Sequence, residues 1–538
     1  MKKIYFFILF LSCFAGYAQE EDAWVYFNVK NNSQSYLDNP LLMLSQRALD
    51  RRTKQNISLD SKDIPIDKSL INQIKSVSGI TVMAKSKWLN ALHIRGTQAV
   101  INSLKSFVFV DKVDFANKSL NLTARISTTV KEKLVSKTSE TKIDFAYGNS
   151  ANQIQMLHGD NLHQQNYTGS GKIIAVLDAG FPGVDTAQPF QRLITNGQIL
   201  GGYDFVRGNV NFYTGDSHGT LVLSGMGGYK ENSLIGTAPD ASYYLFITED
   251  DSTENPVEES YWVEAAEKAD SLGVDVISSS LGYFQFSKAA YNHTYADMDG
   301  KTAYATRGAE IAFSRGMLIV ICAGNAAGSS DPYIGTPADG ISVLTVGAVN
   351  ATKTVTNFSS IGPSSDGRIK PDVLSQGKAV VLSGASGVIV TADGTSFATP
   401  LIAGLVACLW QAFPNKTNTE IKDLITKSAD RYTAPNNQYG YGIPDFSLAL
   451  STGLGVNDFS KKDIFLYPNP TNSLSTVSFP ENFDTALFQV YSILGQKMLE
   501  QTITKALPSI SLKTLQAGVY IYTLNWDGNI SSGKLIKQ

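Results

Sequence analysis

Ser396 is a candidate nucleophile, because it stands just before a strongly apolar segment. That segment, 401–410, reads LIAGLVACLW, which predicts a buried helix. Pro400 is tolerated only in the first turn of such a helix, so Ser396 should lie at the helix N-terminus. Backbone N–H groups have no partner there, and they could stabilise an oxyanion that forms beside a nucleophile. A helix N-cap at Thr395 or Ser396 is the ordinary alternative, and the local sequence does not decide between the two.

Three further polar residues stand where they could assist a nucleophile. Asp178 ends the apolar segment KIIAVLD, His218 lies in the glycine-rich segment GDSHGTLVLSGMGG, and Asn325 ends MLIVICAGN. Taken singly, they are equally well explained by a turn aspartate, a structural histidine and a turn asparagine. Together with Ser396 they supply an orienting acid, a base, an oxyanion donor and a nucleophile, in a chain order that serine proteases use.

The chain between about 145 and 450 alternates short apolar segments with helix-like ones. The apolar segments include KIIAVLD, ASYYLFIT, VDVISSSLG, MLIVICAGN and SVLTVGAV. Such nearly continuous apolar strands indicate a parallel sheet that helices cover on both faces. Functional residues in such sheets lie at the carboxyl ends of the strands, where Asp178 and Asn325 stand. The predicted fold class is therefore α/β.

The chain resembles the subtilases, the family of subtilisin-like serine proteases. The resemblance runs from 176 to 400 and rests on nine segments in the family's order, which are VLDAG, HGTLVLSG, GTAPDA, SSSLG, CAGN, GTPA, FSSIGP, KPDV and GTSFATP. It implies a subtilisin-like parallel sheet flanked by helices, and we expect this peptidase domain to cover 144–452.

The resemblance implies a role for each of the four candidate residues. Ser396 would be the nucleophile, His218 the base and then the acid, and Asp178 the group that orients the imidazole. The Asn325 side chain and the Ser396 backbone N–H would form the oxyanion hole. The implied activity is that of a serine endopeptidase, which hydrolyses peptide bonds through an acyl-enzyme intermediate.

The resemblance also implies where a substrate lies. The backbone of Ser280, Leu281 and Gly282 would pair with the peptide as an added strand. The same segment, with Ala323 and Gly324, would line the pocket for the residue before the scissile bond. The implied partners are protein or peptide substrates.

Two positions depart from the family's pattern. Ala179 stands where the family usually has Thr or Ser, and Leu221 stands where it often has a second His. Neither position carries the proton transfer, so the departures bear on specificity more than on activity. The family often binds calcium, but no ligand oxygens can be located in this sequence. No cofactor is therefore predicted to be required and no metal site is assigned, so calcium is implied by the resemblance alone.

The first 18 residues predict a signal peptide. Lys2 and Lys3 precede an apolar run that ends near Phe14, and Ala18 is the expected cleavage site. A membrane anchor is the alternative, but the run is shorter than the about 20 residues that span a bilayer. The mature protein is therefore expected to be exported.

Residues 19–115 alternate strand-like and helix-like segments, which predicts a small α+β domain. This unit resembles a subtilase propeptide, which in the family assists folding and blocks the cleft until it is cleaved. Residues 116–143 are rich in Lys, Ser and Thr, which predicts an exposed linker. We expect the propeptide, a partner of its own protease domain, to be removed there.

The C-terminal residues 460–538 predict an all-β sandwich. The segment LYPNPT is rich in turn residues, and two later segments read as hairpins, the second with its turn at Asp527 and Gly528. The unit resembles the C-terminal sorting domain of type IX secretion substrates, on LYPNPT, VYSILGQKM, LQAGVYIYTL and the terminal KLIKQ. It implies the outer-membrane secretion machinery as a partner and a secreted or cell-surface location. A generic accessory sandwich that binds glycan or protein is the alternative.

Composition excludes several other classes of function. The formal net charge is −3 and the pI near 6.0, which gives no reason to expect a nucleic-acid partner. Cys322 and Cys408 lie in apolar segments, so we expect buried free thiols. GSGK at 169–172 hints at a phosphate loop, but it leads into a strand and lacks the first Gly. The acidic segment 249–259 could favour basic substrates, although a solvated loop is the preferred interpretation.

The sequence thus predicts a secreted serine endopeptidase that is made as a precursor. Its first alternative is a catalytically weak protein of the same fold that binds partners at the surface, which would have no need for all four candidate residues. An ester hydrolase of the α/β-hydrolase class is a second alternative. That class orders its triad Ser, acid, His and uses GxSxG, and neither is present here.

Overall fold

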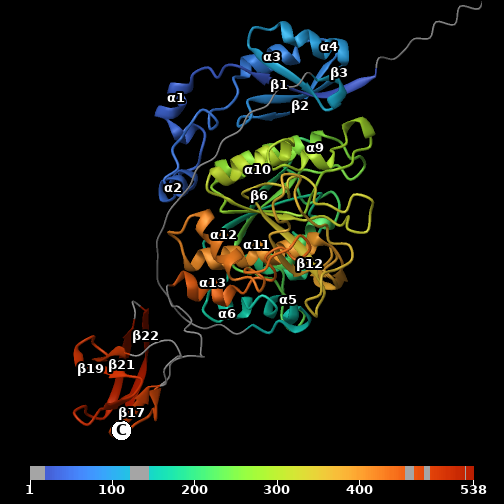
Figure 1. Ribbon diagram of the computed structural model, residues 1–538. Coiled ribbons are helices and arrows are strands. Elements are labelled where there is room, and N and C mark those ends of the chain that lie inside the picture. The colour runs from blue at the N-terminus through green and yellow to red at the C-terminus, as the bar shows by residue number, and fades with distance from the viewer. Residues whose placement is uncertain (1–18, 122–144, 455–465, 478–484, 527–528) are drawn as a thin grey trace, which may run out of the picture. The chain divides into compact units, whose positions relative to one another are not determined.

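The computed structural model describes residues 19–121, 145–454, 466–477, 485–526 and 529–538 (Figure 1). They form two compact units that divide between Gly455 and Val456. The predicted signal peptide, 1–18, and most of the predicted linker, 116–143, lie outside the described residues. The first unit contains both the N-terminal α+β part and the large α/β part, and the second is the C-terminal part.

A parallel sheet of seven strands forms the centre of the large part, as predicted. The strand order is β13-β12-β11-β10-β5-β9-β6. The strands are β5 (Ile173–Asp178), β6 (Ile199–Asp204), β9 (Ser242–Ile247), β10 (Val276–Ser279), β11 (Leu318–Cys322), β12 (Leu344–Val349) and β13 (Val373–Gln376). In this register Asp178 lies opposite Ile247 and Leu177 lies opposite Ser279. The parallel arrangement brings the carboxyl ends of β5, β10 and β11 to one edge.

Helices cover both faces of this sheet (Figure 1). Because side chains alternate along a strand, Ile174 and Val176 of β5 pack into one hydrophobic core, and Ala175 and Leu177 pack into the other. The first core is built with α8 (His218–Gly227), α11 (Thr395–Ala412), α12 (Asn418–Lys427) and α13 (Phe446–Gly453). The second is built with α9 (Val257–Leu272) and α10 (Tyr304–Ser314).

Short elements connect these layers. They are α5 (Ala151–Gln155), α6 (Gly159–His163), α7 (Gln191–Thr195) and the strand pairs β7 (Tyr229–Lys230) with β8 (Leu234–Ile235) and β14 (Val380–Ser383) with β15 (Ile389–Ala392).

Helix α11 is the core helix behind Ser396. Among the described residues it is the one helix long and apolar enough to cross a membrane, and 94% of it is buried inside the protein. The helix begins at Thr395, so Pro400 lies in its second turn and the prediction of a first-turn position was wrong. Pro400 has no N–H to offer the carbonyl oxygen of Ser396, four residues earlier. The Ser280 hydroxyl donates to that oxygen instead, over 2.6 Å, which explains why this proline is tolerated.

The N-terminal part is the predicted α+β domain. Its antiparallel sheet has the order β2-β3-β1-β4, from β1 (Glu20–Phe27), β2 (Ile80–Ser86), β3 (Ala91–Thr97) and β4 (Val110–Phe115). Helices α3 (Lys68–Lys75) and α4 (Gln98–Ser103) cover one face. The other face lies against α9 and α10, where Trp24 stacks on Tyr304 with ring centroids 4.9 Å apart. Two further helices, α1 (Ser33–Asp38) and α2 (Gln46–Lys54), lie between β1 and α3 in the chain.

The C-terminal unit has two antiparallel sheets that share one hydrophobic core, which confirms the predicted sandwich. One contains β16 (Leu466–Tyr467), β17 (Leu474–Val477) and β20 (Ser509–Ser511). The other has the order β19-β18-β21-β22, from β18 (Thr485–Ser492), β19 (Lys497–Thr504), β21 (Gly518–Trp526) and β22 (Asn529–Lys537). The predicted turn at Asp527 and Gly528 lies outside the described residues.

Cys322 and Cys408 are buried free thiols, as predicted. Burial raises the pKa of the Cys322 thiol to about 12 and that of Cys408 well above its ordinary value. Both side chains therefore stay protonated at neutral pH and act as small apolar groups.

Candidate active site

Asp178 and His218 are in direct contact at the carboxyl edge of the sheet. Asp178 is the last residue of β5 and His218 the first residue of α8. The imidazole Nδ1 lies 2.8 Å from Asp178 Oδ1, and the backbone N–H of Ala179 donates to the same oxygen over 2.8 Å. The carboxylate thus holds one ring nitrogen, which leaves Nε2 free to accept a proton.

Small residues and a second aspartate bring the two side chains this close. A Cβ on Gly219 would lie 2.4 Å from the carbonyl oxygen of Gly180 and 2.9 Å from the Cβ of Asp178, so only glycine fits there. The backbone N–H of His218 donates to Asp216 Oδ1 over 2.8 Å, which anchors the start of α8. The glycine-rich setting noted in the sequence is therefore a requirement of packing.

The electrostatics of the pair favour a basic imidazole. The negative charge of Asp178 raises the pKa of His218 above its ordinary value of 6.5. Asp178 is fully buried, and its Oδ2 has no hydrogen-bond partner among the described residues. Residue 179 is alanine, which has no hydroxyl to offer that oxygen. The departure noted in the sequence thus removes one possible hydrogen-bond donor to this carboxylate.

Ser396 lies at the N-terminus of α11, close to His218. It is the second residue of the helix and only 9% exposed, and the ring of the next residue, Phe397, lies 5.4 Å from the His218 ring. The Ser396 hydroxyl donates to the carbonyl oxygen of Ser280 over 3.3 Å. The N-cap is Gly394, and no side chain caps the helix, so the N-cap alternative for Thr395 or Ser396 is wrong.

Asn325 is oriented by Thr395. Its Oδ1 accepts from the backbone N–H of Thr395 over 2.9 Å and from the Thr395 hydroxyl over 3.0 Å. Because a backbone N–H can only donate, the amide oxygen must face Thr395, and the Nδ2 group is left to donate elsewhere. Nδ2 would lie 3.7 Å from a Cβ on Gly394, just before the turn that carries Ser396. An amide donor and a helix N-terminus thus meet beside Ser396.

The predicted substrate segments border the same point. Ser280 follows β10 and is tied to Ser396 by two hydrogen bonds, one in each direction. Gly282 is exposed, and Leu281 accepts a hydrogen bond from the Cys322 thiol over 3.5 Å. Ala323 is buried, and the N–H of Gly324 donates to the Thr395 hydroxyl over 3.2 Å. Gly324 has a φ of 99°, a conformation that favours glycine. The structure therefore gathers 280–282 and 323–324 around Ser396.

The central part of the chain, residues 169–442, matches the family model described as "Subtilase family". The chain belongs to the subtilase family. Two more models match this subtilase. One, described as "Peptidase S8 propeptide domain, Bacteroidota", covers 22–134, and the other, "Secretion system C-terminal sorting domain", covers 465–538. The propeptide match runs past 115, so the predicted domain boundaries stay predictions.

Several characterised relatives are similar to the subtilase over its protease domain. It is 31% identical to Subtilisin NAT of Bacillus subtilis subsp. natto over 293 residues, 54% of this chain and 68% of the relative. It is 30% identical to Subtilisin of Bacillus pumilus over 293 residues, 54% of this chain and 94% of the relative. It is 29% identical to Serine protease AprX of Bacillus subtilis over 309 residues, 52% of this chain and 66% of the relative.

Two solved structures are similar in fold. MycP1 from the ESX-1 type VII secretion system has a TM-score of 0.44 and 21% identity, over 58% of this chain and 89% of that one. The prenylagaramide maturation protease PagA has a TM-score of 0.45 and 20% identity, over 56% of this chain and 99% of that one.

The comparisons establish the class of protein. The subtilase is a serine endopeptidase made as a zymogen with a propeptide. Its sorting domain indicates export by type IX secretion, to the cell surface or beyond it.

Sequence reasoning missed two residues that organise this site. One is Ser280 as a hydrogen-bond donor to Ser396, since the segment 280–282 was expected only to pair with the substrate and to line its pocket. The other is Thr395, which was named only in the N-cap alternative and which positions both Asn325 and Gly324. A signal for the first was present, because a proline four residues after Ser396 leaves the Ser396 carbonyl oxygen in need of a donor.

The acidic segment of the subtilase is more ordered than a solvated loop. Glu258 and Glu259 are buried, so that interpretation is wrong for them. The backbone N–H groups of Asp250 and Asn255 donate to the Glu258 carboxylate, and the hydroxyl of Tyr283 donates to Glu249 over 2.6 Å. Burial raises the pKa of Glu258 to about 8. These carboxylates therefore hold the segment in place.

Calcium has no evident site in the parts of the chain that the structure describes. No group of three or more His, Cys, Asp or Glu side chains there could hold a metal ion. Ca²⁺ also binds backbone carbonyl and side-chain amide oxygens, which these four residue types do not supply through their side chains. The role of calcium stays an implication of the resemblance, and no step below depends on it.

Proposed function

We propose that this subtilase hydrolyses peptide bonds with a triad of Asp178, His218 and Ser396, through an acyl-enzyme intermediate. The contact that supports this most strongly is the 2.8 Å approach of His218 Nδ1 to Asp178 Oδ1, at the edge of the sheet where Ser396 begins α11. A structural histidine would need no buried carboxylate and no serine at a helix N-terminus beside it.

The first half-reaction acylates the enzyme. Nε2 of His218 takes the proton of the Ser396 hydroxyl while the serine oxygen attacks the substrate carbonyl carbon. The electron pair of the carbonyl bond moves to its oxygen, which the Asn325 amide and the Ser396 backbone N–H stabilise. His218 then gives its proton to the leaving amine as the C–N bond breaks. The Asp178 carboxylate stabilises the imidazolium throughout.

The second half-reaction releases the acid product. A water molecule gives its proton to His218 and attacks the acyl carbon, and the same two donors stabilise the second oxyanion. The intermediate collapses as His218 returns the proton to the Ser396 oxygen. Atoms and charge balance over the two steps, and no cofactor is consumed.

Attack requires one local change from the structure described above. The Ser396 hydroxyl must leave the carbonyl oxygen of Ser280 and donate to His218 Nε2 instead. Catalytic hydrogen bonds of this kind often tighten only when a substrate is bound. The backbone of Ser396 is held by α11 and by Ser280, so the proposed change is in the serine side chain.

The substrate is proposed to be a protein or peptide in extended conformation. Gly282 is exposed, so its backbone is accessible to an added strand. The propeptide is proposed to occupy this cleft until the chain is cut in 116–143, and the outer-membrane secretion machinery to recognise 460–538.

Hydrolysis of a fluorogenic protein substrate tests the proposal. The mature protein should show steady turnover with a burst of the first product from an activated ester, because acylation precedes hydrolysis. Ser396→Ala protein, purified in the same way and freed of its propeptide, should show neither. Equal turnover by the Ser396→Ala protein would contradict the proposal.

A further inference from the structure

The propeptide contacts the protease domain through two adjoining surfaces, which meet at Ser271 near the C-terminal end of α9. The first is the face of its sheet against α9 and α10, where the Glu267 carboxylate accepts from the Ser86 hydroxyl over 2.6 Å and from the N–H of Trp88 over 2.9 Å. The second is made by the segment 45–63, which includes α2 and packs against the C-terminal end of α9. The N–H of Ser45 donates there to the carbonyl oxygen of Ser271 over 2.8 Å.

Arg51 inserts into the protease domain from α2. Its side chain is 5% exposed and that of its partner Asp270 is fully buried, with 2.5 Å between Nη2 and Oδ1. Nη1 donates to the carbonyl oxygen of Val274, and Nε donates to the carbonyl oxygen of Arg315 over 3.2 Å. Every acceptor of this guanidinium therefore belongs to the protease domain.

Arg52 binds the same carboxylate from its other side. Its Nη2 lies 2.8 Å from Asp270 Oδ2 and 2.9 Å from Asp63 Oδ1 of the propeptide. Asp60 in turn lies 2.8 Å from Arg315 of the protease domain. Positive and negative groups alternate across the interface, so each buried charge is paired.

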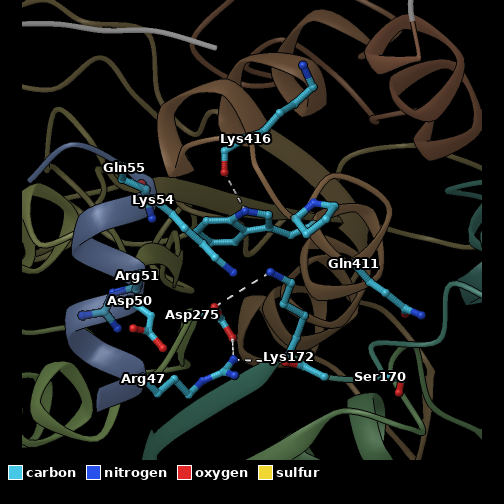
Figure 2. Close-up of a pocket in the computed structure, with 13 residues that line it drawn as sticks. Arg47, Asp50, Arg51, Lys54, Gln55, Ser170, Lys172, Asp275, Gln411 and Lys416 are labelled. Carbon is cyan, nitrogen blue, oxygen red and sulfur yellow. Dashed lines mark hydrogen bonds and ion pairs between the residues drawn. The ribbon is translucent and has the colours of Figure 1, made fainter. Parts of the chain in front are cut away.

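A rim of weaker contacts surrounds this network. Arg47, 40% exposed, pairs with Asp275, and Lys172 lies 3.9 Å from the same carboxylate. A cavity of about 290 Å³ separates α2 from the loop that carries Lys172. Figure 2 shows Arg47 and Arg51 on one side of it, and Asp275 and Lys172 on the other. Arg47 at this rim is partly open to solvent, whereas Arg51, Arg52 and Asp270 are buried.

This second contact is remote from the active site. Val274 and Asp275 precede β10 at its N-terminal end, and Ser280 follows β10 at its carboxyl end. Five residues of extended chain span roughly 17 Å. The parallel sheet therefore has the arginine contact at one edge and the triad at the other, so a peptide bound at the triad does not touch the arginine contact.

We propose that the mature protease domain carries a second docking site for its propeptide, an arginine site formed by Asp270 and the carbonyl oxygens of Val274 and Arg315. Its partner is a helix that presents Arg51 and Arg52. When the propeptide leaves, water can solvate the Asp270 carboxylate, so its charge does not destabilise the mature enzyme. While the propeptide is bound, removal of either partner leaves the charge of the other buried and unpaired.

The consequence is slow dissociation of the cut propeptide. Truncation of one partner of a buried, hydrogen-bonded charge pair acts mainly on the dissociation rate. The site should therefore retain the propeptide after the linker is cut, and it should select a propeptide that has both arginines. This inference rests on the propeptide assignment and not on the triad.

The test uses the full chain with Ser396→Ala, so that the protein does not process itself. A recognition sequence for a site-specific protease is inserted in 122–144, and the protein is immobilised by its C-terminus and cut. The dissociation rate of the N-terminal fragment is then followed under flow. Asp270→Asn should raise that rate at least about 100-fold. Lys85→Ala, which removes an exposed partner of Glu264 at the sheet contact, should change it less than about fivefold.

A double-mutant cycle distinguishes recognition from local unfolding. Arg51→Met should raise the rate as Asp270→Asn does, and the two together should add little to either one alone. With Ser396 restored, mature Asp270→Asn protein should keep its kcat/KM within about twofold, because Asp270 touches no reacting group. Equal rates for Asp270→Asn and Lys85→Ala, or fully additive effects in the cycle, would overturn the proposal.

Discussion

Asp178 and His218 are 40 residues apart in the chain, and Oδ1 of the first lies 2.8 Å from Nδ1 of the second. The contact depends on β5 ending at Asp178, on α8 beginning at His218, and on the absence of a side chain at Gly219. A buried carboxylate placed in this way fixes which imidazole nitrogen carries the proton. Substitution of Asp178 should therefore have a large and specific effect on catalysis.

Asp178→Asn should lower kcat about 10⁴-fold at neutral pH with little change in fold. The amide can present its N–H₂ group to Nδ1, which moves the ring proton to the nitrogen that must accept. Steady-state kinetics on a peptide substrate measure the effect. Asp216→Asn is the matched control, because the Asp216 carboxylate accepts from the backbone N–H of His218 and not from its ring, and the kcat of this variant should stay within about tenfold of the parent.

The pH dependence of kcat/KM should report His218. The imidazole must be neutral to take the serine proton, and the charge of Asp178 raises its pKa above 6.5. Activity should therefore be full well above that pKa and fall tenfold per pH unit below it. A pH–rate profile of the mature enzyme should show one ascending limb with its midpoint above 6.5. A midpoint below 6.5 would contradict the assigned pair.

Asn325→Leu should lower kcat about 10²–10³-fold and leave KM nearly unchanged, because the lost donor acts on the transition state. Leucine also removes the acceptor for Thr395, so a second variant is needed. Asn325→Asp keeps an oxygen for Thr395 but has no N–H, and it should lose at least as much kcat. A loss confined to KM in both variants would place Asn325 in substrate binding instead.

Ser280→Ala should lower the free energy of unfolding by about 1–3 kcal/mol, because it leaves the buried carbonyl oxygen of Ser396 without a donor. Pro400 is the reason that the oxygen lacks its helical partner. The double variant Ser280→Ala with Pro400→Ala regains a backbone N–H at 400, so it should recover most of that loss. Denaturant unfolding of the propeptide-free proteins measures both. No recovery in the double variant would show that the hydroxyl acts in some other way.

The parallel sheet could be predicted from the sequence, and so could the position of four site residues at one edge of it. Each of these predictions depended on a local pattern of residues. Asp178 ends an apolar strand, His218 follows two turn-forming residues, and Ser396 precedes an apolar helix. The hydroxyl of Ser280 could not be placed, because its role depends on where α11 begins. A start at Leu401 instead of Thr395 would have made Pro400 harmless and the extra donor unnecessary.

The contact of α2 with the protease domain could not be predicted from the sequence either. The N-terminal domain was expected to contain helix-like segments, and α2 is one of its helices. A short helix with several arginines most often lies in solvent, since arginine is seldom buried without a partner. Its partner here is Asp270, which lies 218 residues later in the chain, and only the assembled fold brings the two together.

Covalent labelling of the serine tests the central claim most directly. The mature secreted protein is treated with a fluorophosphonate and digested, and the modified peptide is identified by mass spectrometry, with Ser396→Ala protein as the control. The account predicts a label on Ser396 alone, because attack on phosphorus needs the same base and oxyanion donors as attack on carbon. Folded protein that is free of its propeptide and takes no label on Ser396 would contradict the account.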